Sequence, residues 1–299
     1  MKKRLILLTF ILLAACRQEL TTTVDTPIIV TNIVVVEPTA TATSTPVPTT
    51  PPTVPPPTAT PVTFPAQEPL PSGPVSMIAI GGSITQGVGD ETGQGYPTRM
   101  LALLPENYSG FTVTNFGQAG WDSNDVIQGR DGFFGQLPRA VSEIQSAAKQ
   151  GRSTVVFVWV GGNDLLYLYG ESGETTAAQE DQNLADFTAN MDAILFDLRN
   201  AGARVIVALL DDQSKRPLSS EFLANITSDE LTRMSRQVGR YNEVIRQTAR
   251  QYGAATVDFY TTDIFQNPAN LSSDGLHPNA AGYELIARTW FEALLLLLP

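Results

Sequence analysis

Five short apolar runs that alternate with helix-forming stretches constrain the fold of this chain more than any other feature of its sequence. The runs cover residues 75–80, 111–116, 154–160, 204–210 and 255–259. Charged residues occur only at or near their ends. Apolar runs of this length are typical of strands that are buried on both faces of a parallel sheet. The sequence therefore predicts five buried parallel strands.

Five other stretches carry apolar residues at the spacing of a helix. They cover residues 96–104, 137–150, 184–200, 229–252 and 278–298. Right-handed crossovers place such helices on both faces of a parallel sheet. The alternation predicts a three-layer α/β/α sandwich whose catalytic groups lie at the carboxyl ends of the strands. The leucines at 294–298 are too few to cross a bilayer, which takes ~20 residues, so we expect them in the core.

The N-terminus has the features of an export signal. Basic residues at 2–4 precede an apolar stretch at 5–15, which ends in small residues before Cys16. Residues 13–16, Leu-Ala-Ala-Cys, resemble the lipobox of bacterial lipoproteins. That resemblance implies removal of residues 1–15, acylation of Cys16 and anchoring on the outer face of a bacterial membrane. A cleaved signal peptide with an incidental cysteine is the alternative.

A tether is expected between this signal and the domain. Of the 21 prolines in the chain, 14 lie between Thr21 and Pro74, so this segment favours the extended polyproline conformation and cannot build a core. We therefore predict a lipidated, disordered segment at 16–74 and one domain at 75–299. Cys16 is the only cysteine, so the domain must be stabilised by its core without disulfides.

Charge and composition exclude several classes of partner and cofactor. The formal net charge of −11 would become −14 on removal of the basic residues at 2–4, which disfavours nucleic acid and anionic lipid as partners. A single histidine and a single cysteine leave no cluster for zinc. No phosphate-binding Gly-x-x-x-x-Gly-Lys run occurs in the sequence. We expect neither a metal nor an organic cofactor.

A candidate nucleophile follows the first predicted strand. Residues 81–85 read Gly-Gly-Ser-Ile-Thr, so Ser83 lies where a strand exits into a sharp turn. Glycine lacks a Cβ, which permits such turns and leaves space in front of the serine for a substrate carbonyl. Gly-Gly-Ser is also a common loop, so this signal is weak when taken alone.

The only histidine strengthens the hypothesis. His277 lies three residues after Asp274, just before the last predicted helix. An aspartate at this spacing in a turn can bind the histidine Nδ1 and fix the tautomer whose Nε2 takes a proton from a serine. The alternative is that Asp274 or His277 merely caps the helix that begins near Pro278.

Two further strand ends offer hydrogen-bond donors for an oxyanion. Gly117 follows the second predicted strand, and the third runs into Gly161-Gly162-Asn163-Asp164. A glycine N–H and the Asn163 amide can stabilise the negative charge that develops in acyl transfer. We expect Asp164 to brace the Asn163 loop.

Together these residues resemble the SGNH, or GDSL-like, hydrolases, whose four sequence blocks carry a Ser, a Gly, an Asn and an Asp-x-x-His in that order. Ser83 matches the first block, Gly117 the second, within Asn-x-Gly-x-x-Gly, Asn163 the third, and Asp274 with His277 the fourth. The resemblance implies a flavodoxin-like sheet of five parallel strands and an acyl-serine intermediate. It also implies a catalytic triad of Ser83, Asp274 and His277 and an oxyanion hole formed by Ser83, Gly117 and Asn163.

The chain departs from the family at one position: Gly82 stands where an aspartate is common. Loss of that carboxylate would remove a brace from the serine turn or reshape the pocket. Three functions remain open at this stage. The first is an extracytoplasmic serine esterase that hydrolyses small carboxylic esters, including acetyl or short acyl groups on carbohydrate. The others are a cell-surface glycan O-acyltransferase and, because of Gly82, a non-catalytic glycan-binding module.

Overall fold

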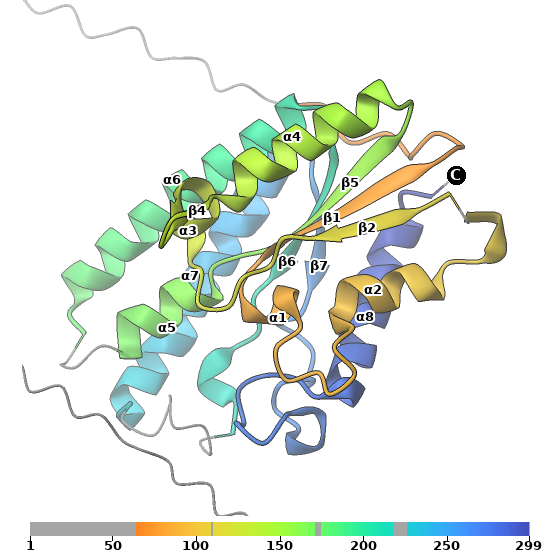
Figure 1. Cartoon of the computed structure of the whole chain (residues 1–299). Helices are drawn as coiled ribbons and strands as arrows, with labels where there is room; N and C mark the ends of the chain where they lie inside the picture. The colour runs from red at the N-terminus through yellow and green to blue at the C-terminus, as the bar shows by residue number, and fades with distance from the viewer. Residues whose placement is uncertain (1–63, 109, 171–174, 218–225, 299) are drawn as a thin grey trace, which may run out of the picture. The chain divides into compact units, whose positions relative to one another are not determined.

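The computed structural model describes residues 64–298, except residue 109 and the segments 171–174 and 218–225 (Figure 1). The main sheet has five parallel strands in the order β2-β1-β5-β6-β7. They are β1 (Val75–Gly81), β2 (Thr112–Asn115), β5 (Ser153–Trp159), β6 (Arg204–Leu209) and β7 (Ala255–Asp258). In chain order this arrangement is 2-1-3-4-5, the flavodoxin-like order, so the predicted sheet is confirmed.

Helices cover both faces of the sheet (Figure 1). On one face lie α2 (Gly95–Leu103) and α8 (Ala280–Leu295), and on the other α4 (Gln136–Lys149), α6 (Ala177–Asn200) and α7 (Ser228–Gln251). The three-layer α/β/α sandwich is therefore also confirmed. Within the described residues, no helix combines the length and apolar character needed to cross a membrane.

The predicted elements differ from the observed ones mainly at their ends. Helix α6 begins at Ala177 rather than at 184 because its first two turns are polar and carry no apolar periodicity. Its start is instead marked by a capping box between Thr176 and Gln179. The last helix begins at Ala280 rather than at 278.

Several short elements were not predicted. They are α1 (Ser83–Gln86), α3 (Ser123–Gln128), α5 (Gly162–Gly170), the hairpin of β3 (Gly129–Arg130) and β4 (Phe133–Phe134), and the 3-10 helices η1 (Glu106–Tyr108), η2 (Gln213–Lys215) and η3 (Pro268–Asn270). All of them except α5 are too short to show a helical or strand period in sequence.

The domain begins earlier than residue 75. The Phe64 N–H donates to the Gln251 carbonyl at 3.0 Å, and the Phe64 ring centroid lies 5.5 Å from that of Tyr252. Leu70 is 1% exposed and belongs to the core. Residues 64–74 are thus part of the packed domain, and the predicted boundary at Val75 is wrong. The predicted signal at 1–15, Cys16 and the remainder of the tether lie outside the described residues.

Aromatic side chains of both sheet and helix meet in the core. Trp159 stacks on Phe259 with ring centroids 4.2 Å apart, and Trp290 of α8 lies edge-on to Trp159 at 5.9 Å. Of the C-terminal leucines, Leu294 and Leu297 are buried while their neighbours 295 and 296 are exposed. The expected core packing of this run therefore holds for one side of the helix end only.

Candidate active site

Ser83 lies at the end of β1, at the switch point of the sheet. Connections leave β1 and β5 toward opposite edges, so the crevice between their carboxyl ends is the position where open α/β sheets bind ligands. Gly81 makes the turn possible: it has φ +151°, and a Cβ there would lie 2.2 Å from the Trp159 carbonyl oxygen. The first helical turn, α1, then begins at Ser83 itself.

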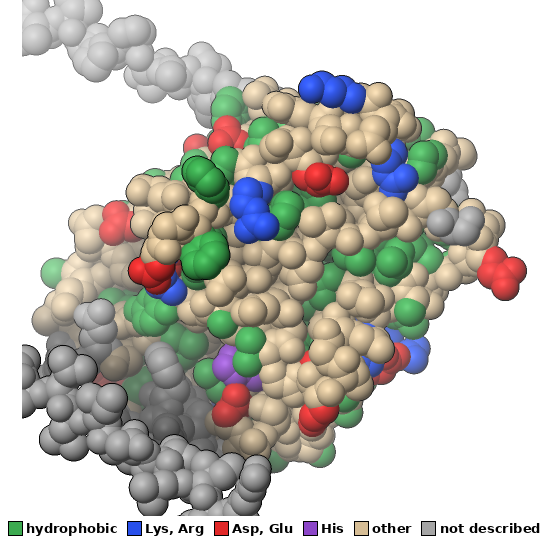
Figure 2. Space-filling view, in the orientation of Figure 1, with side chains coloured by type: hydrophobic (Ala, Val, Ile, Leu, Met, Phe, Trp, Pro, Cys, Tyr) green, Lys and Arg blue, Asp and Glu red, His purple; other side chains and the backbone are tan. Residues whose placement is uncertain are grey.

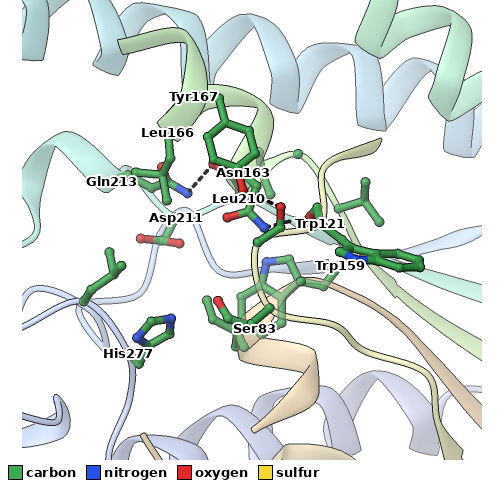
Figure 3. Close-up of a pocket in the computed structure, with 18 of the residues that line it drawn as sticks. Ser83, Trp121, Trp159, Asn163, Leu166, Tyr167, Leu210, Asp211, Gln213 and His277 are labelled. Carbon is green, nitrogen blue, oxygen red and sulfur yellow. Dashed lines mark hydrogen bonds between the residues drawn. The ribbon is translucent and has the colours of Figure 1, made fainter. Parts of the chain in front are cut away.

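A cavity of about 270 Å³ opens beside Ser83 (Figure 3). Its lining includes Ser83, Asn163 and His277, which come from the start of α1 after β1, from the first turn of α5 after β5 and from the loop before α8. Figure 3 shows the His277 ring near Ser83, with one ring nitrogen on the serine side. In Figure 2 the histidine, coloured purple, is visible at the surface beside an acidic side chain. Three residues that are distant in sequence thus border one space.

Asp274 and His277 are paired as the sequence predicts. Asp274 Oδ2 lies 2.7 Å from His277 Nδ1, and Asp274 Oδ1 accepts the backbone N–H groups of Leu276 and His277 at 2.8 and 2.9 Å. Ser272 Oγ donates to the same carboxylate at 2.8 Å. Burial alone would raise the pKa of Asp274, but these hydrogen bonds outweigh it and hold the pKa well below its usual range. The carboxylate therefore stays ionised and favours the tautomer with the proton on Nδ1.

The helix-capping alternative for this pair is wrong. Helix α8 is capped by Asn279, whose Oδ1 accepts the Gly282 N–H at 3.0 Å. Asp274 accepts no hydrogen bond from the first turn of α8 among the bonds of the described residues. The Asp274 carboxylate instead forms its hydrogen bonds with its own loop and with the His277 ring.

Within the residues that the structure describes, Ser83 and His277 are not hydrogen-bonded to each other. Ser83 Oγ also makes no other hydrogen bond with the described residues. Catalytic hydrogen bonds in enzymes without substrate are often long and tighten only when the substrate binds. In this structure the Ser83 and His277 residues both line one cavity.

The predicted donor Gly117 does not border this cavity, whereas Gly120 does. The Gly117 N–H donates to Asn115 Oδ1 at 2.9 Å, so this donor is already used. A Cβ at 117 would lie 2.4 Å from the Gln86 nitrogen, which shows that this glycine is required for close backbone packing. The Gly120 N–H has no partner among the described residues. The expectation for Gly117 is thus corrected: the second glycine of the motif faces the site.

Asn163 lies next to the serine turn and also lines the cavity. Its Nδ2 donates to the Trp121 carbonyl at 2.7 Å, which leaves the second hydrogen of the amide without a bond to any described residue. A Cβ at Gly82 would lie 2.9 Å from this Nδ2. Glycine in place of the family's aspartate therefore gives the Asn163 amide room next to the nucleophile turn.

Asp164 braces the loop, in accord with its predicted role. It is buried, and its carboxylate accepts both the backbone N–H and the hydroxyl of Ser123. Asn190 of α6 donates to the same hydroxyl at 2.9 Å. Burial raises the pKa of Asp164 to about 7. These bonds tie the Asn163 loop to the start of α3 rather than aiming the carboxyl at a substrate.

Gln136, like Gly120, was not identified from the sequence as a residue of the site. It is fully buried at the start of α4, and its side-chain amide binds the backbone of Gly81. A glutamine before an apolar helical stretch carries no signal for such a contact, because the partner lies 55 residues away in the chain. Gln136 fixes the end of β1, directly before the serine turn.

Comparison with known proteins agrees with this arrangement. The sequence model of the GDSL-like Lipase/Acylhydrolase family matches residues 79–285, more than half of the chain. The Multidomain esterase of Ruminococcus flavefaciens is 24% identical over 245 residues, which cover 75% of this chain and 29% of that protein. Uncharacterized protein YpmR of Bacillus subtilis (strain 168) is 22% identical over 228 residues, covering 74% and 81%. The match thus spans less than a third of the multidomain esterase.

Solved structures share the fold. An extracellular lipase from Streptomyces rimosus matches with a TM-score of 0.52 at 18% identity, covering 75% of this chain and 99% of that one. The lipase Lip_vut3 from a goat rumen metagenome matches with a TM-score of 0.54 at 19% identity, covering 73% and 97%. The family model and the fold together confirm the resemblance stated from the sequence. The chain belongs to the GDSL-like lipase/acylhydrolase (SGNH) family.

Proposed function

We propose that this protein hydrolyses small carboxylic esters, such as acetyl or short acyl groups on carbohydrate, through an acyl-enzyme on Ser83. One observation carries the proposal: Ser83, Asn163 and His277 line one cavity, and Asp274 is bonded to the far side of the His277 ring. A cavity of about 270 Å³ suits a small ester better than a long acyl chain.

In the proposed mechanism, the ionised Asp274 keeps the proton of His277 on Nδ1. Nε2 then accepts the Ser83 proton while Oγ attacks the ester carbonyl carbon. The same imidazolium gives its proton to the departing alcohol, which leaves the acyl group on Ser83. A water molecule, deprotonated by His277, then releases the carboxylic acid and restores the serine.

The oxyanion of each tetrahedral intermediate needs donors that are in place beforehand. We assign this role to the backbone N–H groups of Ser83 and Gly120 and to Asn163 Nδ2. Gly120 replaces Gly117 in this set because it borders the cavity and its N–H is not used by a described residue. The hydrogen bond from Nδ2 to the Trp121 carbonyl orients the Asn163 amide.

Hydrolysis of p-nitrophenyl acetate by the purified full chain tests the proposal. We expect turnover by the wild type and by Ser142→Ala, an exposed serine on α4 that serves as the matched control. Ser83→Ala and His277→Ala should lose the activity. Equal activity in all four proteins would overturn the assignment of the site. If acetyl groups appeared on an added oligosaccharide faster than as free acetate, the acyltransferase alternative would replace the hydrolase.

For the location, the proposal is export and anchoring through a lipid on Cys16. It rests on the basic residues at 2–4, the apolar stretch at 5–15 and the Leu-Ala-Ala-Cys sequence at 13–16. Expressed in a bacterium, the full chain should sediment with membranes and incorporate labelled palmitate. The Cys16→Ala variant should do neither. Palmitate labelling that persists in Cys16→Ala would overturn the proposed anchor.

A further inference from the structure

The cavity beside Ser83 is lined by a hydrogen-bond acceptor that no described protein group uses. Gln213 is the first residue of η2, which follows β6, and its side chain lies on the wall of the cavity (Figure 3). The residue is 3% exposed. Its Oε1 is buried and accepts no hydrogen bond from any residue that the structure describes. Buried polar atoms are nearly always paired, so an unpaired acceptor in a cavity wall indicates a partner supplied by the ligand.

The orientation of this amide is fixed by the protein. Gln213 Nε2 donates to the Gly162 carbonyl at 3.3 Å, shown as a dashed line in Figure 3. A Cβ at residue 162 would lie 2.9 Å from Nε2, so glycine at this position makes room for the contact. Rotating the amide would set two acceptors against each other. Oε1 is therefore the atom left for a ligand, and that ligand must donate a hydrogen.

The charges of the residues near Gln213 indicate that the ligand group that donates to Oε1 is neutral. Arg216 also borders the cavity, and its Nε and Nη2 donate to the two oxygens of Asp211 at 2.8 Å each. Its Nη1 donates to the Leu276 carbonyl at 3.0 Å. The guanidinium is thus neutralised and its three nitrogens are engaged. Among the described residues of this wall, Arg216 is the only Lys or Arg, so they offer no free cation to a carboxylate or phosphate group.

Apolar side chains line other parts of the cavity wall. Leu166 and Leu210 are 7% and 1% exposed, and Trp121 is 6% exposed. A hydrogen bond made among such apolar groups is stronger than one in water, and an unmade one is more costly. The wall therefore discriminates between ligands that bring a hydroxyl to Oε1 and ligands of equal size that bring a methyl group.

We propose that Gln213 Oε1 accepts a hydrogen bond from a hydroxyl group of the ester substrate, so that the enzyme selects hydroxylated neutral esters over alkyl esters of the same size. The inference rests on the proposed esterase function and narrows its substrate class. The hydroxyl can belong to the alcohol portion, as in a partly acylated sugar, or to the acyl portion, as in a hydroxy acid ester. Gln213 would act on selectivity, since it lies on the cavity wall and not in the catalytic pairing.

Two isosteric pairs of esters test the inference and distinguish these sources. 2-Hydroxyethyl acetate against propyl acetate varies the alcohol portion, and methyl glycolate against methyl propionate varies the acyl portion. For the full-length wild type we expect kcat/KM to favour the hydroxylated ester about tenfold or more in one pair, because a site built around a polar group rejects the analogue that leaves it unpaired. The pair that shows the preference identifies the side that carries the hydroxyl.

The variant Gln213→Leu should erase this preference, measured as the ratio of kcat/KM within each pair of esters, so that the result does not depend on the absolute activity of the variant. Gln182→Leu, an exposed glutamine on α6, is the control and should keep the preference. A wild type that cleaves esters without preference in either pair would overturn the inference alone, even if Gln213→Leu failed to fold. A preference that survives in a folded Gln213→Leu would also overturn it. Loss of all ester cleavage in the wild type would instead overturn the proposed function.

Discussion

The Gln136 side chain closes two hydrogen bonds with the backbone of Gly81: the Gly81 N–H donates to Oε1 at 2.7 Å, and Nε2 donates to the Gly81 carbonyl at 2.9 Å. The amide therefore pairs with the last residue of β1 as a neighbouring strand would. Strand β2 pairs with β1 only as far as Ala79. The residue that immediately precedes Gly82 and Ser83 is thus held by a helix side chain, and this contact fixes the base of the serine turn.

Removal of this side chain should destabilise the fold and the site together. In Gln136→Ala, the Gly81 N–H loses its buried partner, whereas the Gly81 carbonyl still accepts the Gln118 N–H at 3.0 Å. One unpaired buried group costs about 1–3 kcal/mol, so we expect the free energy of unfolding in urea to fall by about 1–3 kcal/mol and kcat to fall at least tenfold. Gln150→Ala, which removes an exposed contact with Ser146, should change neither. Unchanged stability in Gln136→Ala would contradict this role.

Asp274→Asn keeps His277 in place and tests whether Asp274 orients its ring. The amide can donate to Nδ1, which favours the tautomer with the proton on Nε2, where it cannot accept the serine proton. In hydrolases with a Ser-His-Asp triad such a change lowers kcat by about 10⁴-fold, and we expect a loss of about 10³–10⁴-fold here with little change in KM. Steady-state kinetics beside Asp263→Asn, an exposed aspartate, provide the test. A loss below tenfold would show that Asp274 does not orient the base.

Asn163→Ala should reduce transition-state stabilisation with little effect on substrate binding. Loss of one side-chain donor to an oxyanion typically lowers kcat by about 10²–10³-fold. We expect this fall in kcat with KM within about threefold of the wild type. Asn163→Asp, which keeps the shape but cannot donate, should be equally impaired. An Asn163→Asp enzyme with wild-type kcat would remove Asn163 from the oxyanion hole.

The buried carboxyl of Asp164 predicts a pH dependence of stability. Its pKa in the folded protein is about 7 against an ordinary value of 3.8, so between these values the folded state holds a proton that the unfolded state has released. Rising pH therefore favours unfolding across this range. We expect the free energy of unfolding to fall less steeply with pH in Asp164→Asn than in the wild type. Urea titrations at several pH values give the two slopes, and Asp186→Asn on α6 should retain the wild-type slope.

Identical pH slopes for Asp164→Asn and the wild type would contradict the raised pKa. They would indicate that the hydrogen bonds from Ser123 keep the carboxylate ionised in spite of its burial.

Strands β1, β5 and β6 could be predicted because each is an apolar run that is buried over almost its whole length, with Arg204 as the only charge. The edge strands β2 and β7 have similar apolar runs in the sequence, although the structure leaves them partly exposed. Short elements gave no such signal. Helix α5 has apolar residues at successive positions, as in Leu165 and Leu166, so no period emerges. Helix α3 is only one and a half turns long, although its capping box between Asp122 and Asp125 is a start signal that the sequence does contain.

The catalytic candidates could be predicted from motifs, but the orientation of a backbone group could not. Gly117 and Gly120 belong to one motif, and only the turn conformation decides which N–H faces the cavity. Gly120 has φ +74° and borders the cavity, whereas Gly117 packs against the backbone near Gln86. Sequence spacing alone does not distinguish these two outcomes.

Long-range side-chain contacts also could not be predicted from the sequence. Asp211, Gln213 and Arg216 directly follow the fourth predicted strand, which marks them as residues at a strand's carboxyl end. Their roles depend on partners that lie far away in the chain, such as the Gly162 and Leu276 carbonyls. Only the folded arrangement shows that one of these side chains keeps an unpaired acceptor.

The proposed function depends on acylation of Ser83 with His277 as the base. The most direct measurement is the mass of the full-length protein, quenched in acid during turnover of p-nitrophenyl acetate, followed by mapping of the modified peptide. The account predicts one acetyl group on Ser83 in the wild type and none in Ser83→Ala or His277→Ala. An acetyl group on another residue, or acetylation of Ser83 at an undiminished rate without His277, would contradict it.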